Sequence, residues 1–314
     1  MKTEKPVSSR ITFIGIWRVF KESLSGFSSD KVAKLAASLA YCTVFSFAPL
    51  LIVIIYVCSL FYGREAIEGA VYRQLQGFVG PESAEQLQQI IKNAAISGSG
   101  TLAIIIGVIT LIIGATSIFT EVQDSINSIW CLKAKPKMGF KLFLRNRLMS
   151  FGMLASLGFM LLVSLAVSAV VDVIGRRLQY YLPDVTLVII YIINLLLSIG
   201  ISTLLFAVIF KVLPDATVKW KDVWAGSLTT SILFNVGKYL ISFYISKANI
   251  GSTYGAAGSL AVLLIWIYYS SLILYFGAEF TKAWAVKFRQ GISASPYAVV
   301  ISKNEVEHRS QKVK

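Results

Sequence analysis

The sequence lacks the residues from which most enzyme active sites are built. It has one histidine, His308, among 314 residues, and no P-loop, GxSxG or HExxH motif. A histidine-based nucleophile or zinc site inside the molecule is therefore excluded. We expect no enzymatic activity, no cofactor and no resident metal. The alternative is a magnesium site held by Glu121 and Asp124, two carboxylates three residues apart.

Cysteine is almost as scarce, with Cys42, Cys58 and Cys131. Their spacing matches no metal-binding or redox motif. Cys42 and Cys58 would lie about 24 Å apart along one helix, which is too far for a disulfide. We predict that all three side chains simply pack against their neighbours.

Charged residues are few, and long stretches have none. Only 15% of the residues are charged and 56% are hydrophobic, whereas a soluble domain has roughly 25% charged residues. Five runs have no charge, and each is longer than the ~20 residues that cross a bilayer as a helix. They are Leu35–Gly63, Asn93–Thr120, Leu148–Val171, Val185–Phe210 and Ala248–Ala278. A sixth apolar stretch, Val223–Ser246, contains the single charge Lys238.

These runs predict an all-α fold, because unpaired backbone groups are costly in lipid and a helix satisfies them internally. We expect a polytopic membrane protein with a six-helix transmembrane domain at residues 35–283. The predicted spans are 35–62, 98–120, 148–171, 185–210, 223–246 and 254–279.

The basic residues set the expected orientation. Most of the 30 Lys and Arg residues fall in the N-terminal segment, in the 121–147 and 211–222 loops and in the tail from Glu279. The positive-inside rule then places both termini in the cytoplasm. Because this rule accounts for the net charge of +14, we expect the lipid bilayer as partner and no nucleic acid.

Three segments lie outside the predicted spans. Residues 64–97 are expected to form two short helices separated at Pro81, as a lid or a plain cap over the outer surface. Residues 284–314 form a polar tail that we expect to be disordered after Gln290. Residues 1–34 contain an amphipathic helix, which would lie on the inner leaflet or against the base of the bundle. Its apolar positions are Phe13, Trp17, Phe20, Leu24 and Phe27.

A stripe of small residues runs along the second span and includes Gly107 and Gly114. Small residues let another helix approach closely, so this face should turn into the bundle. Glu121 and Asp124 continue the same face, and no turn residue separates them or Asn127 from the span. We therefore expect the two acids at the cytoplasmic end of the same helix, directed toward the protein interior.

The sixth span carries a second polar stripe. Tyr268, Tyr275 and Glu279 share one face, after a glycine-rich entrance at 251–259 that includes Gly255. An acid that faces inward in a membrane helix is a functional candidate, whereas an acid at the helix end is often only interfacial. Both readings stay open for Glu121 and Glu279.

The fifth span places Asn235 and Lys238 on one polar face. Lys238 lies about 24 Å from Asp222 along the helix, near the expected outer boundary. It would either extend to the outer headgroups or pair with Asp172 or a phosphate headgroup. In the first span, Pro49 is expected to kink the helix.

Five stretches of the chain resemble the YihY/virulence factor BrkB family of bacterial inner-membrane proteins, formerly labelled ribonuclease BN. They cover roughly residues 30–285 and include "LAASLAYCTVFSFAPLL", "VQDSINSIW", "LPDATVKWKDVWAG", "GKYLISFY" and "YGAAGSLAVLLIWIYYSSLILYFGAEF". The resemblance implies six helices with both ends cytoplasmic. It implies no settled activity, although some members are linked to the movement of lipids or lipopolysaccharide precursors or to virulence.

The resemblance also points to individual positions. Where members often carry a basic residue or asparagine after the proline that follows the fourth span, this chain has Asp215. The matching positions are Ser38, Tyr41, Ser46, Pro49, Gln123, Asp124, Asn127, Trp130, Pro214, Trp220, Gly226, Lys238, Tyr254, Gly255, Trp266, Gly277 and Glu279.

Three functions fit these observations. The first is a transporter or lipid-translocating protein, in which the polar stripes contact a lipid or lipid-linked substrate and the acids act at an inner gate. The second is an envelope scaffold that transports nothing. The third is a membrane-tethered ribonuclease, for which the residues offer no plausible centre.

Overall fold

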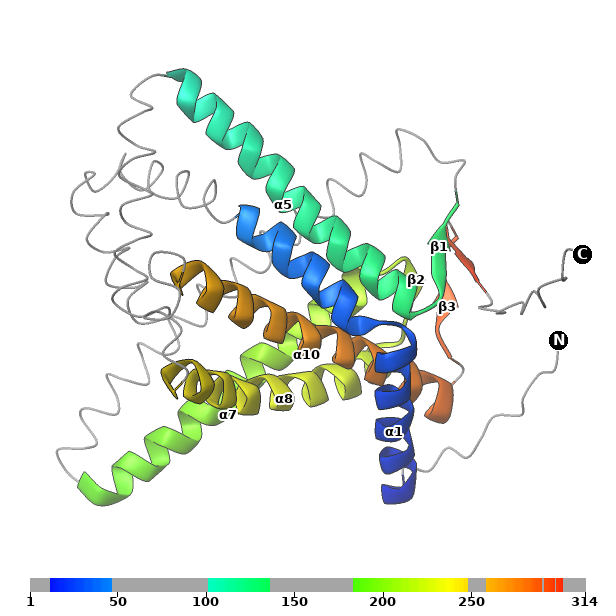
Figure 1. Ribbon diagram of the computed structural model, residues 1–314. Helices are drawn as coiled ribbons and strands as arrows, with labels where there is room; N and C mark the ends of the chain where they lie inside the picture. Colours follow the sequence, from blue (N-terminus) through cyan, green and yellow to red (C-terminus); the bar gives the residue numbers. More distant parts are fainter. Residues whose placement is uncertain are drawn as a thin grey trace, which may run out of the picture.

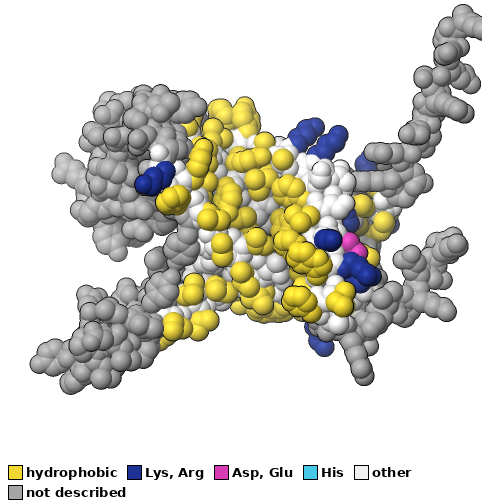
Figure 2. Space-filling model, turned by 60° about the horizontal axis from the view of Figure 1, so that its bottom comes forward, with side chains coloured by type: hydrophobic (Ala, Val, Ile, Leu, Met, Phe, Trp, Pro, Cys, Tyr) yellow, Lys and Arg dark blue, Asp and Glu magenta, His cyan; other side chains and the backbone are white. Residues whose placement is uncertain are grey.

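The computed structural model describes residues 12–46, 101–135, 183–247, 258–289, 291–296 and 298–301. Within these residues, long helices converge at one end of the molecule and spread apart toward the other (Figure 1). Short strands and the helix α1 lie at the end where the long helices converge. We call this the charged end, because Lys and Arg side chains gather there, beyond a broad hydrophobic surface (Figure 2).

The described helices match the apolar runs of the sequence. The chain begins with α1 (Phe13–Ser29) and a second helix, Val32–Ser46. The long helices are α5 (Thr101–Ile129), α7 (Pro183–Val212), α8 (Trp220–Lys247) and α10 (Gly258–Phe288). Pro183 opens α7, where its fixed φ suits a helix start and its missing N–H leaves no bond unmade.

Four predicted spans coincide with helices, namely 98–120, 185–210, 223–246 and 254–279. Val32–Ser46 covers the beginning of 35–62, whereas 148–171 and the outer loop 64–97 lie outside the described residues. Among the described helices, Leu195–Val212 and Leu260–Phe288 are long and apolar enough to cross a membrane, judged by length and composition. The helical character of the fold is confirmed, while the six-span topology and the orientation stay predictions.

Two sharp turns shape the charged end. Lys31 has φ 53° and Cys131 has φ 55°, a left-handed conformation that non-glycine residues seldom adopt and that stops a helix. At the first turn the Asp30 N–H donates to the Gly26 carbonyl at 2.8 Å. As a result, α1 runs crosswise at the end of the bundle, at a steep angle to α8 and α10 (Figure 1).

Two small antiparallel strand pairs join the tail to the bundle. β1 (Leu132–Ala134) pairs with β4 (Ala298–Val300), and β2 (Ala216–Thr217) pairs with β3 (Ser293–Ala294). The expected all-α fold omits these strands. The expectation of disorder after Gln290 is wrong for residues 291–296 and 298–301, because backbone pairing with β1 and β2 orders them.

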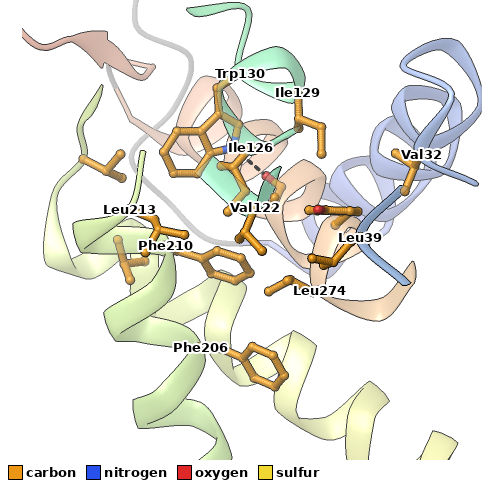
Figure 3. Packing of buried hydrophobic residues seen from close by; sticks show 14 of the residues in the cluster. Val32, Leu39, Val122, Ile126, Ile129, Trp130, Phe206, Phe210, Leu213 and Leu274 are labelled. Atoms are coloured by element: carbon orange, nitrogen blue, oxygen red, sulfur yellow. Dashed lines mark hydrogen bonds between the residues drawn. The ribbon is translucent and has the colours of Figure 1, made fainter. Parts of the chain in front are cut away.

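The hydrophobic core lies where Val32–Ser46, α5, α7, α8 and α10 meet near the charged end (Figure 3). Trp130 closes one side of this core, and Phe210 of α7 is fully buried at its centre. The other labelled members come from Val32–Ser46, α5, α7, the residue directly after α7, and α10; they are Val32, Leu39, Val122, Ile126, Ile129, Phe206, Leu213 and Leu274.

The outer surface of α8 is apolar. Exposed side chains recur every four residues along it, which is the spacing of one helix face. A continuous exposed apolar face of this kind indicates contact with lipid or with another apolar surface. Its members are Leu228, Ile232, Val236, Leu240 and Phe243.

Candidate functional site

A cluster of charged side chains is buried at the charged end, between α1 and α10. Glu279 of α10 is 3% exposed. The Lys282 Nζ atom lies 3.8 Å from Glu279 Oε2 and 3.3 Å from Asp30 Oδ2. Gly26 of α1 allows this approach, since a Cβ there would lie 2.6 Å from Glu279 Oε2. One lysine thus lies between two carboxylates from different elements.

Lys282 also fixes the end of α5. Its ammonium group donates to the carbonyl of Ile129, the last residue of α5, at 2.5 Å. Carbonyls in the last turn of a helix have no partner within the helix, and a cation there is favourable for the helix dipole. In return, Trp130 Nε1 donates to the Ala278 carbonyl of α10 at 2.9 Å (Figure 3). Reciprocal bonds therefore join the end of α5 to α10.

A second buried carboxylate, Asp215, lies between α7 and α8 and is 5% exposed. Gln123 Nε2 donates to Asp215 Oδ1 at 3.1 Å, and Asn127 Nδ2 donates to Oδ2 at 3.0 Å. The Asp215 N–H donates to Asn127 Oδ1 at 2.9 Å, and the Ser295 N–H donates to the Asp215 carbonyl at 3.0 Å. A buried carboxylate needs such donors to offset its lost hydration. Asp215 thereby ties α5, the α7–α8 connection and the tail together.

Two further acids stand beside these clusters, beyond the predicted spans. Asp222 Oδ1 lies 3.4 Å from Arg289 Nε. Burial raises the pKa of Asp222, although Arg289 and Lys219 act to lower it. The pKa of Asp124 is also raised, first because neighbouring protein atoms limit the hydration of its carboxylate although the residue as a whole is exposed, and then by the negative charges of Glu121 and Asp215.

Together, the clusters around Lys282 and Asp215 form a closed, charged junction. In the part of the chain that the structure describes, no group of three or more His, Cys, Asp or Glu side chains could hold a metal ion. Its cations and carboxylates contact one another and the backbone ends of helices. Such a junction can hold helices together or, by separating, let them move apart.

Comparison with known proteins identifies the family to which the chain belongs. The family model for the virulence factor BrkB matches residues 23–299, which include Asp30, Asp215, Glu279 and Lys282 of the junction. The chain belongs to the virulence factor BrkB family. It is a membrane protein, as its relatives are named.

The most similar relatives span much of the BrkB-family chain. A UPF0761 membrane protein of Pseudoalteromonas atlantica is 23% identical over 263 residues, 83% of this chain and 84% of its own length. One from Aeromonas salmonicida is 26% identical over 82% of this chain and 85% of its own length. One from Ralstonia nicotianae is 26% identical over 83% of this chain, which spans only 57% of that relative. No solved structure matches.

The predicted site residues of this BrkB-family protein fall into different environments. Glu279 and Asn127 are buried at the charged end, as is Pro214 beside Asp215. Tyr275 of α10 is fully buried, its hydroxyl facing Ser125, with Glu121 near it. Glu121 is half-buried. The structure therefore brings Glu121 and Tyr275 to the contact between α5 and α10, whereas Glu279 lies against Gly26 of α1.

The predicted inward face of α5 is wrong at its charged end. Ser117, Asp124 and Ser128 are exposed, whereas Val122, Ser125, Ile126 and Ile129 are buried. The apolar and small side chains that α10 and Val32–Ser46 cover lie on the α5 face next to the predicted one. Gly114 does approach a neighbour, since a Cβ there would meet the buried Ser46 side chain.

The polar face of α8 forms hydrogen bonds to α7 and within α8 itself. Ser198 Oγ of α7 donates to Asn235 Oδ1 at 2.7 Å, and Asn235 Nδ2 donates to the Ser231 carbonyl at 2.9 Å. Asn235 therefore joins α7 to α8. Lys238 is half-buried, and its predicted partner Asp172 lies outside the described residues.

The remaining predicted residues are more scattered. Ser38 and Tyr41 lie on an exposed side of Val32–Ser46, with Tyr41 63% exposed. Tyr268 packs against the hydrophobic core. Gly107 lies within α5, but its environment is not described, and Pro49 and Gly255 lie outside the described residues.

Sequence reasoning missed three residues of the junction, Asp30, Asp215 and Lys282. A signal existed only for Asp215, which departs from the basic residue or asparagine common at this position in the resembling family. Asp30 and Lys282 are one acid and one base among many near predicted helix ends, so their pairing required the packing of α1 on α10.

Proposed function

We propose that this BrkB-family protein moves a lipid or lipid-linked solute across the bacterial inner membrane, as a multi-pass protein with both termini in the cytoplasm. The proposal assigns it no chemical reaction. The observation that carries it is the burial of Glu279, an acid on a helix long enough to cross a membrane, against Gly26 of α1. Ionisable groups facing the interior of a membrane bundle are costly and are retained mainly where substrates, ions or protons pass.

The charged junction is suited to act as the inner gate of such a pathway. Glu279, Lys282 and Asp30 bridge α10 and the end of α1, and Lys282 also bonds to the end of α5. Opening would separate these groups and expose them to water, which hydrates charges well. Closure replaces that hydration by ion pairs, so the two states can lie close in free energy.

The test is lipid translocation in proteoliposomes that contain the purified full-length protein. Fluorescent phospholipids and a membrane-impermeant quencher report how fast the inner leaflet becomes accessible. We expect the wild type to accelerate translocation and the Glu121→Gln/Glu279→Gln variant to lose most of the acceleration. Glutamine keeps the volume that fills the space beside Gly26, so the comparison isolates the charge.

The matched control is Glu22→Gln, an exposed acid on α1, which should leave the rate unchanged. Elution as a single species and an unchanged thermal midpoint establish that each variant is folded. A rate that stays at wild-type level in the double variant would show that the acids take no part in the pathway. No acceleration by the wild type would reject phospholipid translocation and favour the scaffold function.

A further inference from the structure

The helix α1 presents three distinct faces. At 100° per residue, one face packs on α10, the next is apolar and exposed, and the third is polar and exposed. The packed face contains Gly15, Val19, Ser23 and Gly26, the apolar face Phe13, Trp17 and Leu24, and the polar face Arg18, Lys21, Glu22 and Ser25.

The packed face is built for close contact with α10. Val19 and Ser23 are fully buried. A Cβ at Gly15 would lie 2.8 Å from the Phe288 ring, so this ring of α10 packs directly on the backbone of α1. At the other end Gly26 meets Glu279. This tight packing fixes the rotation of α1 about its own axis, and therefore where its other two faces point.

The apolar face is left uncovered. Phe13 is 83% exposed, Trp17 56% and Leu24 50%. Trp17 stacks on Phe20 with ring centroids 5.9 Å apart, and Phe20 meets Phe276 of α10 at 5.6 Å. The aromatic row continues from the exposed strip onto a helix that is apolar enough to span a membrane. Ile14, 70% exposed, is an apolar residue outside this strip.

The position of α1 matches a membrane surface. In the view of Figure 1 it is inclined to α8 and α10 at the charged end, so its axis tilts toward the plane of a membrane that those helices would cross. At the same end, α8 begins with Trp220 and Trp224, 52% and 46% exposed. Exposed tryptophans at the end of a membrane helix mark the headgroup level.

We propose that α1 is an interfacial helix whose Phe13–Trp17–Leu24 strip binds the acyl-chain boundary of the leaflet at the charged end. Its polar face, with Arg18 and Lys21, then meets headgroups and water, an arrangement that suits anionic lipids. Under this proposal both predicted settings of the helix apply, because one face contacts the bundle and another the bilayer. The proposal does not depend on transport.

This placement links the membrane surface to the charged junction. Gly26 contacts Glu279, and Asp30, directly after α1, pairs with Lys282. The depth at which the strip inserts therefore sets the position of the groups around Lys282. Lipid composition or thickness at this leaflet would act on the junction through α1.

The experiment uses single cysteines in full-length protein whose native cysteines are replaced by alanine, labelled with an environment-sensitive fluorophore. Trp17→Cys and Leu24→Cys report the strip, and Arg18→Cys and Glu22→Cys report the polar face. Each variant is reconstituted into phosphatidylethanolamine and phosphatidylglycerol vesicles. Quenching is measured with nitroxide on the lipid acyl chain and with aqueous iodide.

We expect strong acyl-nitroxide quenching and weak iodide quenching at positions 17 and 24, and the reverse at positions 18 and 22. Two positions per face keep the pattern readable if one variant fails to fold. Equal iodide quenching at all four positions would overturn the proposal and place α1 in water. Protection of positions 17 and 24 from both quenchers would also overturn it, since the strip would then be covered by protein.

Discussion

Two reciprocal contacts between glycine and threonine hold α8 against α10. A Cβ at Gly226 would overlap the Thr281 side chain, and a Cβ at Gly277 would overlap Thr230. Each threonine donates to the carbonyl of the glycine four residues earlier on its own helix, Thr230 to Gly226 at 2.7 Å and Thr281 to Gly277 at 2.8 Å. Small residues at such a contact let two membrane helices approach closely.

Gly277→Ala should therefore destabilise the protein. The new methyl group has no free volume and would force α8 and α10 apart, at a cost of about 1–3 kcal/mol typical of overpacking. The thermal midpoint in detergent measures this loss. Adding Thr230→Ala should recover part of it, because the substitution removes the atoms nearest the new methyl group.

The matched control is Gly200→Ala on α7, where no atom lies within 4 Å of the new Cβ. It should leave the midpoint unchanged or raise it slightly, since alanine favours a helix over glycine by up to about 1 kcal/mol. A midpoint for Gly277→Ala equal to that of Gly200→Ala would contradict the close contact.

At the scale of single residues, the sequence predicted the environment of some side chains better than that of others. Periodicity placed Glu279 on one helical face with Tyr275 but left open whether the acid is inward-facing or interfacial; in the structure both side chains are buried. Asp124 was assigned to an inward face by the same reasoning and is exposed. The stripe of small residues fixes the rotation of α5 only where a neighbour approaches, near Gly114. At the charged end, the large apolar residues fix it.

At the scale of elements, long helices were predictable and short strands were not. An uncharged run of more than twenty residues has few alternatives to a membrane helix. A strand of two or three residues carries no periodic signal, and its partner lies far away in sequence, as Leu132 pairs with Val300. The polar composition after Gln290 indicated disorder. Composition carries no information on backbone pairing, so the strands β3 and β4 could not be predicted from it.

The pairing of β1 with β4 predicts a specific crosslink. Lys133 and Val299 are direct partners, and antiparallel partners have Cα atoms about 4.5–5.5 Å apart, within reach of a disulfide. In protein without native cysteines, Lys133→Cys/Val299→Cys should crosslink rapidly under mild oxidation, as seen by a mobility shift.

The control places the second cysteine on the other strand pair. Ser293 belongs to β3, which pairs with β2, so Lys133→Cys/Ser293→Cys should crosslink much more slowly. Similar rates for the two variants would mean that the tail does not hold this register against β1.

At the scale of the whole molecule, the distribution of charge along the chain and the geometry of the structure bear independently on how the protein is oriented in the membrane. The sequence rule uses only the distribution of Lys and Arg along the chain. The structure gathers the strands, α1, the start of α8 and the end of α10 at the charged end (Figure 1). Lys247 ends α8, about 40 Å from its first residue at 1.5 Å per residue, which exceeds the ~30 Å hydrocarbon thickness.

Accessibility in right-side-out membrane vesicles tests the proposed orientation. In cysteine-free protein, we expect Lys247→Cys to react with a membrane-impermeant maleimide before permeabilisation. Thr217→Cys on β2 and Val299→Cys on β4, both exposed, should react only afterwards. Labelling of all three in intact vesicles would rule out a membrane crossing by α8, and a reversed pattern would place the charged end outside. Since lipid-facing α1 and the junction around Lys282 share this end, the same result decides which leaflet acts on the junction.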